Sequence, residues 1–216
     1  MDDALRDAMR QRLQAFEVHR AAHGANSHAA VALAVAEEGL GAGLPGLSSP
    51  AGWSREAALI LTRRARTLSR HAGQWALPGG RVDTGESDEA AALRELAEEV
   101  DLHLEASAIL GRLDDYVTRS GFVISPVVVW AGAARELKPN PGEVASIHRI
   151  RLQEFMRADA PMLEAGDDPA RPIMRMPLGA DWIAAPTAAL IYQLRELLAG
   201  RVTRVGHFDQ PEFARR

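Results

Sequence analysis

The sequence predicts an α/β protein, because segments with strand and helix periodicity alternate along its 216 residues. Short apolar runs at 29–36 and 57–62 are typical of buried strands. Apolar residues three and four positions apart at 87–100 and 187–198 instead indicate amphipathic helices. Apolar residues make up 47% of the chain, so one α/β domain spanning residues 1–216 could bury a sizeable core.

The first quarter of the chain is expected to hold a helix, a strand and a long loop. A helix is predicted over residues 2–20, where apolar side chains recur at helical steps: Leu5, Met9, Leu13 and Phe16. The strand at 29–36 follows. Residues 38–56 are rich in Gly, Pro and Ser and are therefore predicted to form a loop that leads into the strand at 57–62.

Residues 87–100 carry the clearest helix signal. Ser87 is a suitable N-cap, and Asp88 and Glu89 follow in the first turn, where the helix dipole favours negative charge. One face of this helix is apolar and is predicted to be buried: Ala92, Leu93, Leu96 and Val100.

The second half of the chain is expected to add strands and two more helices. Strands are predicted near 106–113, 122–130 and 144–150, a short helix at 152–157, a hairpin at 172–184 and a C-terminal helix at 187–198. Pro126 interrupts the apolar run of the second strand. Because proline has no N–H to donate, it predicts an edge strand or a bulge.

The helix at 87–100 also concentrates negative charge. Glu95, Glu98 and Glu99 lie within one and a half turns, where residues three and four apart are neighbours and like charges repel. Such a face predicts a site for Mg²⁺ or Mn²⁺, which prefer oxygen ligands. A solvated acidic face is the alternative. The Leu-Pro-Gly-Gly sequence at 77–80 favours the metal site, because it suits a tight loop with close backbone approach.

A local basic segment stands just before that loop. Four arginines fall within eight residues of a chain whose formal net charge is −4: Arg63, Arg64, Arg66 and Arg70. Guanidinium groups bind phosphate with paired hydrogen bonds, so the segment predicts contacts to the phosphates of a small substrate. A solvated loop or a nucleic-acid surface is the alternative. Aromatic residues are only 5% of the chain, which disfavours nucleic-acid binding.

Residues 80–102 resemble the Nudix box. The positions that fit the pattern are Gly80, Glu86, Arg94, Glu95, Leu96, Glu98, Glu99 and Leu102, while Asp101 replaces the usual glycine. We expect Asp101 to end the helix in a left-handed conformation, which Asp tolerates better than most residues. The resemblance implies a Nudix-type α/β/α sandwich with a mixed sheet and a loop-helix-loop metal site. It covers about residues 25–160, with an N-terminal helix and a C-terminal helical extension.

Residues 60–80 are similar to the signature of the coenzyme A diphosphatase branch of this family. The matching positions are Leu61, Thr62, Arg64, Ala65, Gly73, Pro78, Gly79 and Gly80. Two positions depart: Ser69 stands where the second Arg is expected, with Arg70 one step later, and Leu77 replaces Phe. The resemblance implies substrate contacts from Arg64, Arg70, Gly73, Gly79 and Gly80.

The implied reaction is hydrolysis of a nucleoside diphosphate linked to another group. Coenzyme A or acyl-coenzyme A would yield a phosphopantetheine fragment and adenosine 3′,5′-bisphosphate. Mg²⁺ or Mn²⁺ at Glu95, Glu98 and Glu99 would neutralise the phosphates and lower the pKa of a water molecule. Glu98 or Glu143 would accept the proton, whereas Arg94 and Glu86 are expected to brace the loop and helix as an ion pair.

Other functions stay open from the sequence. The alternatives are a Nudix diphosphatase acting on ADP-ribose, NADH or a dinucleoside polyphosphate, and a non-catalytic nucleotide-sensing module. The Pro and Tyr that mark the ADP-ribose and diadenosine types beyond the box are missing around Val117–Ser120. We expect a cytoplasmic protein, because there is no cysteine, signal peptide or long apolar run. Its partner would be a small nucleotide and no nucleic acid or membrane, with a homodimer left open.

Overall fold

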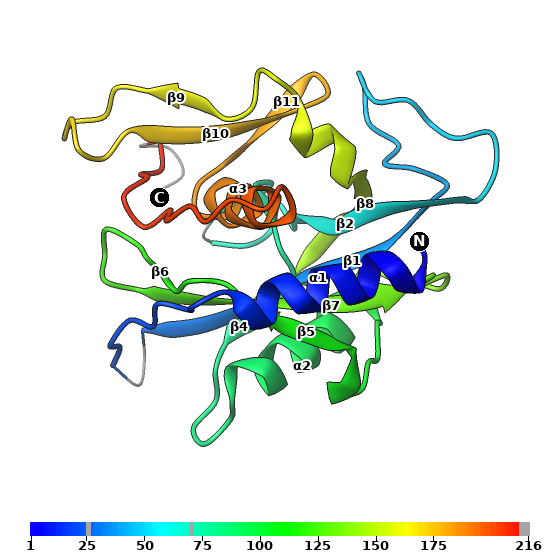
Figure 1. The fold of residues 1–216 in the computed structure, drawn as a ribbon, viewed down its shortest axis with the longest axis horizontal. Coiled ribbons are helices and arrows are strands. Elements are labelled where there is room, and N and C mark those ends of the chain that lie inside the picture. Colours follow the sequence, from blue (N-terminus) through cyan, green and yellow to red (C-terminus); the bar gives the residue numbers. More distant parts are fainter. Residues whose placement is uncertain (25–26, 70, 212–216) are drawn as a thin grey trace.

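The structure, a computed structural model, describes residues 1–24, 27–69 and 71–211 and is built around an eight-stranded sheet (Figure 1). The main path of the sheet runs β3-β2-β1-β7-β5, with β4 beside β1, β6 beside β7 and β8 beside β2. Strands β1 and β7 pair in parallel and the other pairs are antiparallel, so the sheet is mixed as predicted. The strands are β1 His28–Gly39, β2 Ser54–Arg64, β3 Trp75–Ala76, β4 Gly79–Arg81, β5 Ile109–Arg112, β6 Tyr116–Val117, β7 Val123–Gly132 and β8 Val144–Arg151.

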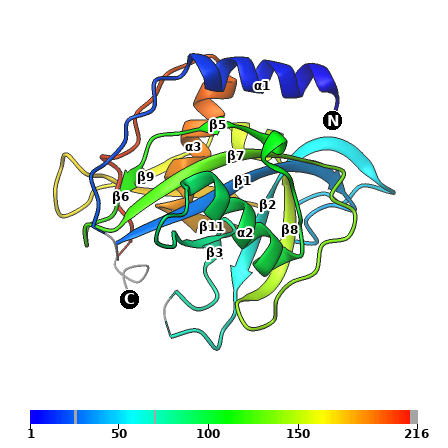
Figure 2. The ribbon, with the colours of Figure 1, turned by 90° about the horizontal axis from the view of Figure 1, so that it is seen from below.

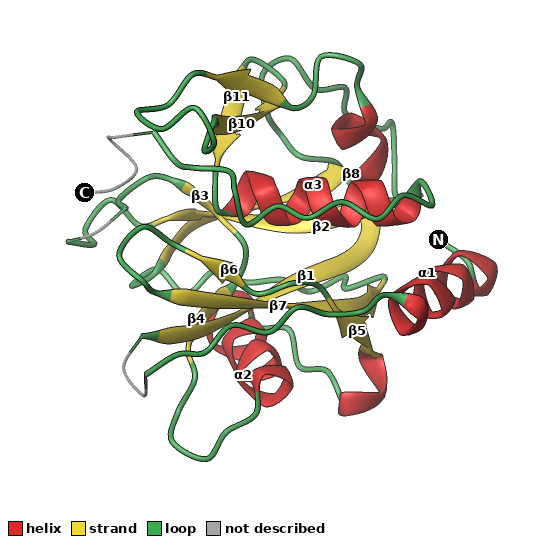
Figure 3. Ribbon diagram, turned by 60° about the vertical axis from the view of Figure 1, so that its left-hand side comes forward, coloured by secondary structure: helices red, strands yellow, loops and turns green. Residues whose placement is uncertain are grey.

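Two helices cover opposite faces of this sheet, α2 (Asp88–Val100) and α3 (Thr187–Leu198) (Figures 1 and 3). Side chains alternate between the two faces along β1. Ala30, Ala32, Ala34 and Ala36 therefore pack with α2, while Leu33 and Val35 belong to the cluster that includes α3. Small residues on the α2 side let this helix lie close to the sheet. The predicted α/β/α arrangement is confirmed.

A second, three-stranded sheet lies beyond α3 (Figure 3). It consists of β9 (Met162–Glu164), β10 (Ile173–Leu178) and β11 (Asp181–Ala184). Strands β10 and β11 form the hairpin predicted at 172–184. The short helix predicted at 152–157 is a 3₁₀ helix, η2, over Leu152–Met156. Among the described residues, no helix combines the length and apolar content needed to cross a membrane.

The N-terminal helix is shorter than predicted: α1 spans Asp3–Ala15 and lies beside β5 (Figure 2). The prediction extended it to residue 20. The chain beyond Phe16 instead donates backbone N–H groups to two acids, His19 to Asp114 at 2.8 Å and Ala21 to Asp115 at 2.9 Å. These bonds replace those that a longer helix would make.

Pro126 was predicted to mark an edge strand or a bulge, and the first of these alternatives is wrong. Strand β7 pairs with β1 on one side and with β5 and β6 on the other. Pro126 falls between the last residue of β7 that pairs with β6, Ile124, and the first that pairs with β5, Val127. The missing N–H therefore lies at the break between two short partner strands, where an interior strand tolerates proline.

Two predicted boundaries also shift. The segment near 106–113 begins as a 3₁₀ turn, η1 (Ala106–Ala108), and only then becomes β5. The loop predicted at 38–56 is confined to residues 40–53, since β1 and β2 extend into it. The loop is tied to the body by hydrogen bonds such as Trp53 Nε1 to Glu37, at 2.6 Å, and Ala180 N to Pro45 O, at 3.1 Å.

Candidate active site

Both ends of α2 have the predicted caps. The Ser87 hydroxyl accepts a hydrogen bond from the Ala90 N–H at 3.1 Å. Asp101 adopts the left-handed conformation, with φ 57° and ψ 35°, and its N–H bonds back to the Ala97 carbonyl at 3.2 Å. The local sequence therefore fixes where this helix begins and ends, and with it the rotational position of its glutamates.

Three carboxylates converge at the side of α2. Glu95, Glu99 and Glu143 each offer an oxygen, and the three oxygens lie within 4.8 Å of one another. Glu95 and Glu99 are buried, with 8% and 4% of their surface exposed, whereas Glu143 is exposed. An oxygen set of this size, open on one side, could hold a divalent cation.

The electrostatics of the three acids fit a cation. Burial, together with the neighbouring charge of Glu95, raises the pKa of Glu99 to about 8. Burial also raises the pKa of Glu95, against the opposing effect of Arg94. The positive charges of the protein therefore do not balance the negative charge of the three carboxylates, and a bound cation would supply the missing positive charge.

The turn that carries Glu143 is fixed by main-chain bonds. The Asn140 N–H donates to the Glu99 carbonyl at 2.9 Å, and the Lys138 N–H donates to the Val100 carbonyl at 3.0 Å. On the other side, the Ala65 N–H donates to the Glu143 carbonyl at 2.8 Å. The turn is thus held between the end of α2 and the end of β2, which sets Glu143 opposite the helix.

The Gly-Gly pair of the preceding loop is needed sterically. A Cβ at Gly79 would collide with the backbone of Ala30 and Val31 in β1. A Cβ at Gly80 would overlap the carboxylate of Glu95. These two positions therefore let the loop lie against both the sheet and the acidic face of α2.

Arg94 connects several parts of the site. Its guanidinium makes two bonds of 3.0 Å to Glu86, one of 2.8 Å to Glu95 and one of 3.2 Å to Glu98. Glu86 also accepts from the Asp83 N–H at 3.0 Å, so the ion pair joins the loop to α2. Glu98 is about half exposed and lies outside the group of three carboxylates among the described residues.

The start of α2 is anchored by a buried polar cluster that the sequence did not reveal. Arg112 pairs with Asp88 and with Asp115, the latter at 3.1 Å. His28 Nε2 lies 2.9 Å from Ser125 Oγ and 3.1 Å from Asp88. Since both partners face the same ring nitrogen, the group does not form a Ser-His-Asp triad. Apart from Arg112 and Asp115, its members are far apart in sequence, so local spacing could not have indicated the whole cluster.

Of the predicted phosphate-binding residues, Arg64 lies beside the carboxylates. Its charge lowers the pKa of Glu99, and its buried Nε has no hydrogen-bond partner among the described residues. Gly73 has φ +70° and donates its N–H to the Arg64 carbonyl at 3.1 Å. Arg70 lies outside the described residues, so its predicted contact with substrate stays a prediction.

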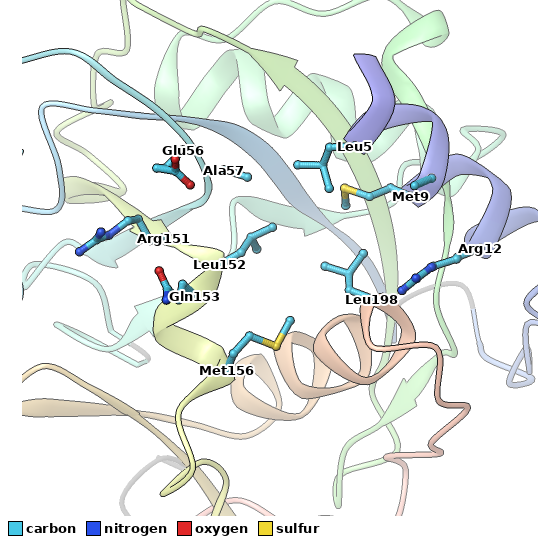
Figure 4. A pocket seen from close by; sticks show the side chains of 11 residues that line it. Leu5, Met9, Arg12, Glu56, Ala57, Arg151, Leu152, Gln153, Met156 and Leu198 are labelled. Atoms are coloured by element: carbon cyan, nitrogen blue, oxygen red, sulfur yellow. The ribbon is translucent and has the colours of Figure 1, made fainter. Parts of the chain in front are cut away.

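Two cavities of the described chain lie at opposite ends of β2. One, of about 210 Å³, is lined by Arg63, Trp75 and residues of β11. The other is an apolar groove of about 360 Å³ between α1, η2 and the end of α3, with Leu5, Met9 and Met156 in its walls (Figure 4). Ala57 in the groove is seven residues from Arg64, roughly 23 Å along the strand, so the groove is remote from the carboxylates.

The sequence profile of the NUDIX domain matches residues 53–175, more than half of the chain and the part that carries the loop, α2 and Glu143. The chain belongs to the Nudix family. The Nudix hydrolase NudL of Photorhabdus laumondii is 40% identical over 99 residues, which are 45% of this chain and 53% of that protein. NudL of Cronobacter sakazakii is 43% identical over 103 residues, 47% and 54% of the two chains.

The chain thus spans about half the length of the curated Nudix relatives it matches. A MutT/nudix family protein from Enterococcus faecalis has a similar solved structure, with TM-score 0.51 and 17% identity over 88% of this chain and 72% of that one. This likeness supports the Nudix fold.

Proposed function

We propose that this protein hydrolyses the diphosphate of a nucleoside diphosphate linked to another group, with Mg²⁺ or Mn²⁺ at the carboxylate cluster. The observation that carries the proposal is the convergence of Glu95, Glu99 and Glu143 beside Arg64. A divalent cation bound there would neutralise phosphate charge and make a water molecule more acidic. The family membership of the chain supports the same reaction.

The side chains of the site have distinct proposed roles. Arg64 binds and orients the diphosphate, because its charge acts on Glu99 of the cluster and its Nε has no hydrogen-bond partner among the described residues. Glu98 or Glu143 accepts the proton of the attacking water, since both are more exposed than Glu95 and Glu99. Glu98 also stays a predicted metal ligand. Arg94 and Glu86 hold the loop against α2.

Coenzyme A or an acyl-coenzyme A is the proposed substrate. The support is the signature at residues 60–80, in which Arg64, Gly73, Gly79 and Gly80 fit the coenzyme A diphosphatase pattern. The products would be a phosphopantetheine fragment and adenosine 3′,5′-bisphosphate. A cytoplasmic location and a homodimer stay predictions from the sequence.

Residues 1–216 are proposed to work as one Nudix domain with helical extensions. One hydrophobic cluster contains residues from both ends of the chain, from Met9 in α1 to Phe208 after α3. It also includes the α3-facing side of the large sheet and the inner residues of β10. A shared core of this kind supports cooperative folding.

A metal-dependent activity screen tests the proposed function. The panel contains coenzyme A, acetyl-coenzyme A, ADP-ribose, NADH and diadenosine polyphosphates, each with Mg²⁺, with Mn²⁺ and with EDTA. We expect phosphate-ester products only with metal, and the highest kcat/KM for a coenzyme A compound. Hydrolysis of another compound of the panel, and not of coenzyme A, would make that compound's class the substrate and would leave the proposed reaction unchanged. Tight nucleotide binding without any turnover would instead favour a sensing module.

A further inference from the structure

The cavity of about 210 Å³ is built by parts of the chain that are far apart in sequence. Its walls come from the end of β2, the segment before β3, strand β11 and the first turn of α3. The side chains that matter here are Arg63, Gln74, Trp75, Asp181 and Trp182. Neither the Nudix box nor the signature at 60–80 assigns a role to any of these five.

The cavity adjoins the proposed catalytic site. Arg63 lines the cavity, and the charge of the next residue, Arg64, lowers the pKa of Glu99. Consecutive side chains of a strand point to opposite faces, so Arg63 faces the cavity on the α3 side of the sheet and Arg64 faces Glu99 on the α2 side, both at the end of β2. Gly73 lines the same cavity and binds the Arg64 carbonyl through its N–H at 3.1 Å. A ligand that passes around the end of β2 could therefore reach both places.

Two indole rings line the cavity, those of Trp75 and Trp182, and a guanidinium is stacked over each: Arg63 over Trp75, and Arg175 over Trp182 at 4.5 Å from the ring centre. Arg63 lies 3.9 Å from the centre of the Trp75 ring and donates to the Gly73 carbonyl at 2.9 Å. Asp181 pairs with Arg63 and accepts from Trp75 Nε1 at 3.1 Å. These bonds hold Arg63 and Asp181 in the wall. Guanidinium planes and aromatic rings both offer flat surfaces on which a nucleobase stacks.

Gln74 is a polar group of the cavity that remains available. It is half-buried, and its side-chain amide has no hydrogen-bond partner within the part of the chain that the structure describes. An amide offers a donor and an acceptor side by side, which matches N6 and N7 of adenine. Guanine presents two acceptors and is matched by arginine, but Arg63 is already engaged.

We propose that this cavity binds the adenine ring of the substrate and that Gln74 selects adenine over guanine. The proposal rests on the proposed function, because it places the base of the same nucleotide whose diphosphate lies at the carboxylates. Arg63 and Asp181 act as positioning residues that keep the Trp75 wall in place. The class of ligand is an adenine nucleotide.

Calorimetric titration of the full chain with AMP and with GMP tests the base directly. We expect AMP to bind about tenfold or more tightly than GMP, as one well-placed pair of hydrogen bonds discriminates between bases. Gln74→Leu keeps the size of the side chain and should weaken AMP binding about tenfold while leaving GMP nearly unchanged. The matched control is Gln153→Leu, which alters the remote apolar groove and should change neither affinity.

The results separate this proposal from the proposed function. Equal affinities for AMP and GMP in the parent, or equal losses in Gln74→Leu, would overturn the assignment of the base while leaving metal-dependent hydrolysis intact. AMP binding that depends on Gln74 in a protein that hydrolyses nothing in the screen would keep the adenine cavity and remove the enzymatic role. Thermal melts of both variants check that each is folded.

Discussion

Gly80 lies directly against Glu95, so that a Cβ on residue 80 would occupy the position of the Glu95 carboxylate. The carboxylate cannot move freely, because Arg94 binds it at 2.8 Å. The backbone of the loop and the acidic face of α2 are thus fitted to each other. This contact explains why a glycine precedes the helix at this spacing.

The substitution Gly80→Ala should therefore displace Glu95 and disturb the carboxylate cluster. We expect kcat/KM to fall about tenfold or more, since small misplacements in an active site cost rate steeply. Gly52→Ala is the control, because a Cβ there meets no atom within 4 Å. Steady-state kinetics over a range of Mg²⁺ concentrations measure both. Unchanged turnover in Gly80→Ala would mean that Glu95 is not needed where it lies.

Glu99→Gln should remove most of the activity while the fold stays intact. The change keeps the shape of the side chain and removes one negative charge from the carboxylate group. Turnover should fall by orders of magnitude at saturating Mg²⁺. Glu98→Gln and Glu143→Gln are measured beside it, because Glu98 lies outside the cluster and Glu143 within it. Near-normal turnover in Glu99→Gln would remove this residue from the ligand set.

The raised pKa of Glu99 predicts that the stability of the metal-free protein depends on pH. Burial and Glu95 raise the pKa of Glu99 to about 8, so between its usual value and pH 8 the folded state binds more protons than the unfolded state. The contribution of Glu99 is present at low pH and is lost as pH rises through about 8. In EDTA, the melting temperature of the parent should therefore fall relative to Glu99→Gln from about pH 5 to pH 8. A constant difference would contradict the raised pKa.

Asp101→Gly should raise the melting temperature by a few degrees, because glycine adopts φ 57° without the strain of a Cβ. Asp101 also lies 3.1 Å from His103 and 3.5 Å from Lys138, and the substitution removes both pairs. These contacts are exposed and screened by salt, so the gain should grow with ionic strength. Asp101→Ala loses the pairs and keeps the strain, and it should melt below the parent. A lower melting temperature for the glycine variant would reveal a stronger contact of Asp101.

Arg64→Lys tests which phosphate this residue meets. Lysine keeps the charge and loses the paired hydrogen bonds of the guanidinium, which are worth roughly 1.5–3 kcal/mol with charged partners. Since Arg64 lies beside Glu99, we expect it to bind the diphosphate. The loss in kcat/KM should then be about tenfold or more on both coenzyme A and 3′-dephospho-coenzyme A. A smaller loss on the dephospho compound would place Arg64 at the 3′-phosphate.

Much of the fold could be predicted because its signals are local. The bounds of α3 agree with the predicted 187–198, and α2 begins and ends at the predicted caps, Ser87 and Asp101. The errors occur where distant residues compete with local preference. Asp114 and Asp115 take the backbone N–H groups that would have extended α1, and two separate partner strands make room for Pro126 inside the sheet.

The sequence by itself determined that Glu95, Glu98 and Glu99 lie on one helix, because spacing along a helix sets which side chains are neighbours. Only the tertiary structure decided which of them converge. The Glu98 carboxylate accepts a hydrogen bond from Arg94. Glu143 lies in a turn that is hydrogen-bonded to the end of α2, and its carboxylate lies beside those of Glu95 and Glu99. The cavity between Trp75 and Trp182 likewise exists only after folding, because 106 residues separate Trp75 from its partner Asp181. Local spacing carries no information about such contacts, since they depend on how the chain returns to pack on the sheet.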